Sequence, residues 1–410
     1  MSRWPLPDRL NLLLVAAVMF TAWGPLCFEI FDAGTDIIQF HVAGRLVHDG
    51  QADRLYDQTY FQSIQTGMPE IHPKGWYYSL YPPMVAMVLA PWAGLPYLEA
   101  RLVWWIVEAA AFVAAGLMLY RWMPIAPRWK PTAILALAAL FPVWMALRVG
   151  QLTPLWLLAL AGGTLLHDRG HRFRAGLALS LLAMKPQLAA PLVVWLLLRR
   201  DLRALGGMAA GVAVQGLAVA IFLGPAVPLA YLAALPAIAQ ATKLINLTAA
   251  YDHSFAGILN NVLLRWYWLP PERHAVAAVG QLAVAVLAGF LLFRIVQSNR
   301  QPAAQGQQAE HARRCEYAAA VLFLLAATPH LLLYDVSLLA VPIVWLWSSP
   351  EWRMGVVLWL SATVLAAFVF VGLGFSLTVI LALWVLARLA DPLSRQERSC
   401  RCPAGVCPTA

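Results

Sequence analysis

The chain alternates long apolar runs with short polar stretches, and this pattern predicts membrane-spanning helices. Several runs approach the roughly 20 residues that a helix needs to cross a bilayer. Only helices and closed barrels satisfy their backbone hydrogen bonds in lipid, and runs this long and continuous exclude a barrel. We therefore expect an all-α polytopic integral membrane protein. Its apolar segments are 10–30, 84–95, 98–120, 131–148, 152–167, 174–199, 203–223, 273–297, 316–347 and 354–390.

Residues 34–50, which follow the first apolar run, have a different pattern. Thr35 or Asp36 suits the N-cap of a helix, and Gly50 suits the position after its C-cap. Between them, apolar or small residues recur on one face at helical spacing, at Ile37, Phe40, Gly44 and Val47. The pattern predicts an amphipathic helix on the membrane surface with a carboxylate at its N-terminal end.

Composition excludes a soluble globular protein. Hydrophobic residues make up 61% of the chain, charged residues 12%, and the mean hydropathy is +0.68. The net charge of +9 reflects membrane topology, so no nucleic-acid partner is expected. Residues 10–30 form a long run without a small-residue cleavage site, which indicates a retained first span and not a signal peptide.

The positive charges indicate how the spans are folded. We take 84–95 as too short to span, 174–199 as a hairpin turning at Lys185-Pro186-Gln187, 316–347 as a hairpin turning near Thr328-Pro329-His330, and 354–390 as two spans. With these turns, 20 of the 29 lysines and arginines lie on one side, which the positive-inside rule makes cytoplasmic. Both termini are then cytoplasmic.

This topology predicts a single transmembrane domain over residues 1–390, with roughly 10–13 transmembrane helices. A cytoplasmic tail follows at 391–410. Two outer segments, 31–83 with its amphipathic helices and 224–272, are too apolar to be simple solvated loops. The polar interruptions of the spans gather at the same outer face as Asp36, and polar groups at membrane depth are usually functional.

At these residues the chain resembles glycosyltransferase family 87, the polyprenyl-phosphate-sugar-dependent transferases of the GT-C superfamily. The sequence departs from the family pattern at Ile37, where an aromatic residue is common, and only loosely shows the outer-loop serine motif. The matching pieces are Gly34-Thr35-Asp36, Ala43, Gly50, Leu55-Tyr56, Tyr81-Pro82-Pro83 leading to Pro91, Gly150-Gln151, Ala175-Gly176, Met184-Lys185-Pro186-Gln187, Thr328-Pro329-His330 and Tyr334-Asp335.

The resemblance implies a GT-C-like bundle in the inner membrane of a bacterium. It implies transfer of a mannose-like hexose or a pentose from a polyprenyl-phosphate sugar to an envelope glycolipid or glycan on the outer face. An inverting displacement of this kind needs a base, cations for the leaving phosphate and an apolar groove for the lipid. Asp36 is the candidate base, because its carboxylate is ionised at neutral pH. The alternative is an ordinary helix N-cap.

Lys185 is the candidate clamp for the donor phosphate, since it interrupts an apolar hairpin where an unpaired ammonium is costly. The alternative is a lysine that extends to lipid headgroups. Arg148 is a second candidate, or only an anchor at the end of a span. His330 is a third, or a helix-capping histidine.

The candidate substrate-binding residues are Gln151, Gln187, Tyr81, His253, Tyr334 and Asp335. Asp335 alternatively belongs to a buried ion pair, and His253 alternatively has only an interfacial role. No cofactor or metal is expected, because Lys and Arg can neutralise a leaving phosphomonoester. The expected partners are the lipid-linked donor, a lipid or glycan acceptor, and the bilayer.

Two other functions fit the hydropathy. One is a transporter or flippase of a lipid-linked or amphipathic substrate, whose broken helices line the path. Against it, the sequence shows no internal repeat and its polar breaks gather at one face. The other is an inactive scaffold subunit of an envelope-assembly complex, which the presence of both Asp36 and Lys185 disfavours.

Overall fold

The computed structural model describes residues 36–68, 77–122, 130, 141–244, 252–300, 306–346 and 378–391. Within these ranges the elements are α-helices and short 3₁₀ helices, and one isolated antiparallel bridge joins Asp252 to Leu332. The predicted all-α class is confirmed. The predicted span at 10–30, the junction of two spans within 354–377 and the tail beyond Asp391 lie outside the described residues.

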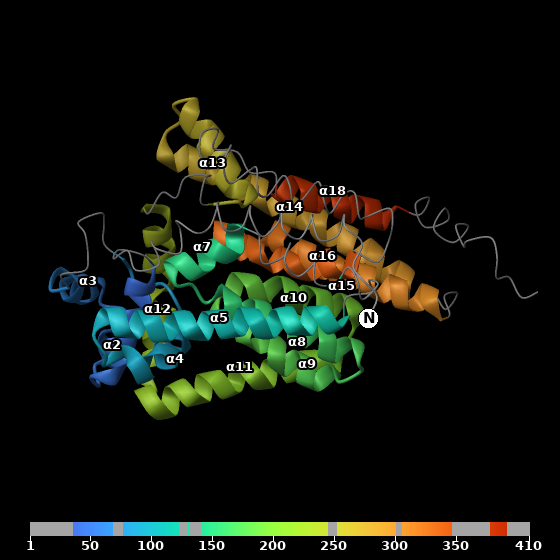
Figure 1. Cartoon of the computed structure of the whole chain (residues 1–410). Coiled ribbons are helices and arrows are strands. Elements are labelled where there is room, and N and C mark those ends of the chain that lie inside the picture. Colours follow the sequence, from blue (N-terminus) through green and yellow to red (C-terminus); the bar gives the residue numbers. More distant parts are fainter. Residues whose placement is uncertain are drawn as a thin grey trace, which may run out of the picture.

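Three helices of the described part are long and apolar enough to cross a membrane: α5 (Tyr97–Trp122), α11 (Leu202–Leu223) and α14 (Pro270–Asn299). Each buries one narrow stripe and exposes large apolar side chains elsewhere, such as Ile106, Ile221 and Leu282. This is the arrangement expected of helices in contact with lipid tails. Figure 1 shows α5 running along the bundle from the end that holds α2 and α4 to the opposite end.

The first predicted hairpin is present, with its turn at the predicted place. It follows α7 (Phe141–Val149) and α8 (Thr153–Asp168), and consists of α9 (Arg172–Leu179), a 3₁₀ helix η4 (Ser180–Met184) and α10 (Pro186–Arg199). Pro186 is the first residue of α10, where its missing N–H costs nothing and its ring prevents continuation of the preceding helix. Lys185 is therefore left between two helical segments.

In the second predicted hairpin, the helix is also interrupted at the expected place. α15 (Gln307–Ala327) ends before Thr328, and the chain continues into η5 (Leu333–Leu339) and α16 (Ala340–Leu346). The side of the bundle formed by α14 and α15 also holds α18 (Thr378–Ala390) (Figure 1).

The outer segment predicted at 31–83 forms α2 (Ile37–His48), η2 (Ala52–Arg54) and α3 (Gln58–Thr66), followed by α4 (Pro83–Ala93). The bounds of α2 agree with the predicted helix, but the helix is more deeply buried than an amphipathic pattern predicts. All its residues from Ile37 to Gly44 are buried, chiefly against α4. A Cβ on Gly44 would lie 3.0 Å from the Leu89 backbone, so the glycine permits this close approach.

The second outer segment contains α12 (Ala226–Leu244) and α13 (Phe255–Arg265). In Figure 1, α12 lies at the same end of the bundle as α2, α3 and α4. We call this end the Asp36 end, because Asp36 is the residue that precedes α2.

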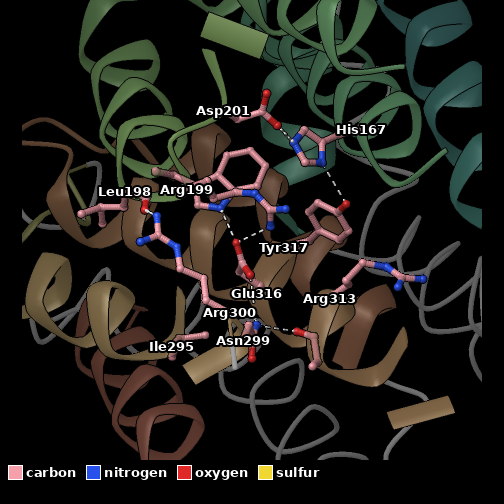
Figure 2. A network of polar contacts seen from close by, with 12 residues as sticks. His167, Leu198, Arg199, Asp201, Ile295, Asn299, Arg300, Arg313, Glu316 and Tyr317 are labelled. Carbon is pink, nitrogen blue, oxygen red and sulfur yellow. Dashed lines mark hydrogen bonds and ion pairs between the residues drawn. The ribbon is translucent and has the colours of Figure 1, made fainter. Parts of the chain in front are cut away.

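A polar network at the opposite end, which we call the Asp201 end, joins four parts of the bundle (Figure 2). His167 lies between the Asp201 carboxylate at 2.9 Å and the Tyr317 hydroxyl at 3.0 Å. Glu316 accepts hydrogen bonds from Arg199, from Trp195 at 3.1 Å and from Asn299 at 3.0 Å. The arginine clusters around 172, 199, 300 and 313 therefore lie together, as the charge pattern predicts.

Candidate active site

Asp36 precedes the first turn of α2, but its side chain is not used to cap that helix. Its carboxylate accepts a hydrogen bond from the Gln151 side-chain amide and another from the Tyr334 hydroxyl. Gln151 comes from the turn between α7 and α8, and its own carbonyl oxygen accepts from the Tyr81 hydroxyl at 3.4 Å. The sequence candidates Gln151, Tyr81 and Tyr334 thus converge on the carboxylate.

Burial is the main influence on the Asp36 carboxyl. Desolvation raises its pKa above the ordinary aspartate value, because the charged form is disfavoured away from water. The Gln151 hydrogen bond, the Lys185 charge, the Tyr334 hydrogen bond and the Arg101 charge oppose this increase. A carboxylate with a raised pKa is a stronger proton acceptor than an exposed one.

Lys185 is buried, with 2% of its surface exposed, and its ammonium is paired with Asp335. The ammonium also lies over the rings of Trp156, at 5.1 Å, and Tyr334, at 5.4 Å. Such cation–π contacts partly replace the lost hydration of the charge. The position of Lys185 between two helices therefore gives a desolvated cation next to Asp36, with Tyr334 in contact with both residues.

Asp335 is fixed by three donors. Besides Lys185, it accepts from the Thr153 hydroxyl at 3.2 Å and from the Leu332 N–H at 3.1 Å. It lies at the start of η5, and its side chain has no exposed surface. The ion pair left open as an alternative by the sequence is present, and Lys185 is its cation.

His330 and His253 belong to a neighbouring cluster. His330 Nδ1 lies 2.9 Å from the Asp252 carboxylate, and the His253 ring lies 3.4 Å from the Thr378 hydroxyl. Burial raises the pKa of Asp252, but the hydrogen bond and charge of His330 outweigh it and hold that pKa below its usual value. The antiparallel bridge to Leu332 connects this cluster to Asp335.

Two candidates from the sequence, Arg148 and Gln187, are linked to other parts of the bundle through their backbone carbonyls. The Arg148 side chain is half-buried, and it is the Arg148 backbone carbonyl that faces the site, where it accepts from Arg101. Gln187 is half-buried, and its backbone carbonyl accepts a hydrogen bond from the Thr328 hydroxyl at 3.3 Å. Among the described contacts, none joins the Gln187 side chain to Asp36 or Lys185.

Sequence reasoning missed four residues that shape the site: Arg101, Trp104, Thr153 and Trp156. Thr153 and Trp156 begin α8 directly after Gln151, so their nearness to the Gly150-Gln151 pair was a usable signal. Arg101 and Trp104 lie within the apolar run at 98–120. An arginine inside such a run is itself a signal, because it is costly in lipid without partners.

The Asp36 end has small cavities on both sides of α2. One is lined by Phe40, Tyr56 and Tyr81 among others. The other is lined by His41, Arg101 and Trp104 among others. Within the described residues, no group of three or more His, Cys, Asp or Glu side chains has the arrangement of a metal site. The site offers a buried base, a buried cation and several hydroxyl and amide groups.

Comparison with known proteins identifies one family. The sequence model of glycosyltransferase family 87 matches residues 79–309, which is more than half of the chain. The match includes Tyr81, Gln151 and Lys185, whereas Asp36 and Asp335 lie outside it. No curated protein and no solved structure matches the chain.

Proposed function

Because the chain belongs to glycosyltransferase family 87, we propose that this membrane glycosyltransferase uses a polyprenyl-phosphate sugar as its donor. The sugar is a mannose-like hexose or a pentose, and the acceptor is a lipid or glycan of the cell envelope. The reaction takes place at the Asp36 end of the bundle. The observation that carries this proposal is that Asp36 and Lys185 lie in one buried cluster, with Tyr334 in contact with both.

The two charged groups suit the two halves of a displacement at the anomeric carbon. The acceptor oxygen forms a bond to that carbon while the bond from the carbon to the phosphate oxygen breaks, and the configuration inverts. The hydroxyl proton passes to Asp36, and the electron pair of the broken bond stays on the lipid phosphate. A base of this kind typically contributes about 10²–10⁴ in rate.

The phosphate gains negative charge as the bond breaks, and Lys185 is the cation that meets it. In the structure Lys185 is paired with Asp335, so an arriving phosphate takes the place of that carboxylate. Asp335 keeps its hydrogen bonds from Thr153 and Leu332 in the exchange. The pair thus holds the lysine in place before the donor binds, and no metal is needed in this scheme.

The arginine clusters at the Asp201 end support an orientation in the membrane. If the positive-inside rule holds, that end is cytoplasmic, both termini are cytoplasmic and the Asp36 end faces outward. The enzyme then works on the outer face of a bacterial inner membrane, where the envelope acceptors lie.

The test is sugar transfer by the purified protein in proteoliposomes, with radiolabelled polyprenyl-phosphate sugars supplied one at a time. Asp36→Asn should abolish transfer and keep expression and donor binding, because the amide cannot accept the proton. Asp49→Asn is the matched control, since Asp49 ends the same helix and is half-exposed in a pair with Arg45. Transfer by Asp36→Asn at the parental rate would show that the base is assigned wrongly.

A further inference from the structure

Two side chains of α5 hold the turn that carries Gln151. The Arg101 guanidinium donates to the backbone carbonyl of Arg148, and the Trp104 indole N–H donates to the carbonyl of Gly150 at 3.1 Å. Arg101 has 2% of its surface exposed and Trp104 has none. One carbonyl of the last turn of α7 and one of the turn that follows it are therefore bound by side chains of a neighbouring helix, directly before the residue that contacts Asp36.

Gly150 makes this arrangement possible. Its φ of +74° belongs to the left-handed region, which favours glycine. A Cβ at this position would lie 2.6 Å from Arg101 Nη1 and 2.7 Å from the Cβ of Ile37. The turn is thus packed tightly between α5 and the first residue of α2. A change in the Arg101 side chain should therefore shift both Gln151 and the start of α2.

The cost of an arginine at this depth indicates a specific task. A charged side chain inside a membrane helix costs about 2.5–3.5 kcal/mol on insertion scales, and a neutral donor could satisfy one carbonyl more cheaply. A guanidinium has several donors in a rigid plane, which fixes both the distance and the direction of its partner. Its charge also acts on Asp36 from within the protein.

We propose that Arg101, together with Trp104, is a positioning residue that aims the Gln151 amide at the Asp36 carboxylate. Neither side chain needs to touch a substrate. They fix two carbonyls of the turn, the turn fixes Gln151, and Gln151 sets the orientation of Asp36 toward the acceptor hydroxyl. The inference rests on the proposed role of Asp36 as the base.

The kinetic experiment compares Arg101→Gln, Arg101→Lys and Trp104→Phe with the parent protein in the proteoliposome assay. We expect kcat to fall by about 10- to 100-fold in Arg101→Gln with little change in KM for the donor, because a misplacement of about 1 Å costs roughly that much. Trp104→Phe keeps the ring, loses one hydrogen bond, and should lower kcat by about 3- to 10-fold. Arg45→Gln, an exposed change on α2, is the control.

The pH profile separates positioning from a general loss of structure. Asp36 acts in its ionised form, so kcat/KM falls as the pH drops through its pKa. Removal of the Arg101 charge and a weaker hydrogen bond from Gln151 both favour the protonated form of Asp36. The acidic limb of the kcat/KM profile should therefore move to higher pH in Arg101→Gln. Arg101→Lys keeps the positive charge but lacks the rigid planar guanidinium. Its acidic limb should therefore lie close to that of the parent protein, whereas its kcat should stay well below the parental value.

A second measurement needs no substrate. In a background with the native cysteines replaced by serine, a short bis-methanethiosulfonate should crosslink D36C/Q151C efficiently, and R101Q or W104F should lower the yield several-fold. Unchanged yield in folded R101Q and W104F overturns the positioning role whether or not transfer occurs. Parental kcat and an unmoved acidic limb in both variants overturn it as well. A parent protein that transfers no sugar refutes the proposed function, and the crosslinking yield still decides the positioning role.

Discussion

The Lys185–Asp335 pair gives the sharpest stability prediction, because both side chains are almost completely buried. Their exposed fractions are 3% and 0%. In Asp335→Asn the side-chain oxygen can still accept from the Leu332 N–H, and the new NH₂ can donate to the Thr153 hydroxyl, which rotates to accept it. The main loss is therefore the negative charge that Lys185 requires. Loss of one partner of a buried pair costs about 3–5 kcal/mol. The ratio of folded to unfolded protein should then fall more than about a hundredfold.

A double variant isolates the charge effect. In K185M/D335N the uncompensated cation is gone, and the Asn can still accept from the Leu332 N–H and donate to the Thr153 hydroxyl, so most of the lost stability should return. The control is Asp168→Asn, which removes the same charge from the Arg313 pair at the Asp201 end. That arginine side chain is 47% exposed, so the cost should be at most about 1 kcal/mol.

The assay is unfolding by SDS in mixed micelles, followed by circular dichroism and tryptophan fluorescence. Asp335→Asn should unfold at a clearly lower SDS fraction than the parent, and K185M/D335N at a fraction between the two. The reasoning is refuted if Asp335→Asn is as stable as the parent. It is also refuted if the double variant is less stable than Asp335→Asn, because the lysine charge would then not be the source of the loss.

Three further predictions follow from other parts of the structure. The acidic limb of kcat/KM should lie above the ordinary aspartate pKa of about 3.9, because burial raises the pKa of Asp36; a pH–rate series that places it at or below that value contradicts the assignment. Gly207→Ala should destabilise by about 1–3 kcal/mol in SDS unfolding, since its Cβ would meet the Phe173 carbonyl oxygen at 2.0 Å, whereas Gly206→Ala, with open space around it, should not. Glu316→Gln should cost about 1.5–3 kcal/mol in the same assay, because Arg199 loses its charged acceptor, and no loss would show that this contact is dispensable.

The breaks in the helices could be predicted from the sequence because their causes are local. Pro186 lacks the N–H that would continue the preceding helix and suits the first position of the next one, and the arginines near 172 and 199 needed to share one side of the membrane. The end of α2 was equally local, because Gly50 directly follows its C-cap with a φ of +73°.

The partners of the site residues could not be predicted in this way. Asp335 is separated from Lys185 by 150 residues, and Gln151 from Asp36 by 115, so only the packing of the bundle brings them together. A carboxylate before a helix has the same local pattern whether it caps the helix or faces a distant amide. The burial of α2 escaped prediction for the same reason, because α4 covers the face that the pattern assigned to water.

The isolated bridge between Asp252 and Leu332 links two parts of the site. It joins the strand-like residues before α13 to the backbone whose N–H binds Asp335. The backbone at Leu332 is thus fixed on one side by Asp252 and bound on the other to the counter-ion of Lys185, so the position of that counter-ion depends on residues from two distant parts of the chain.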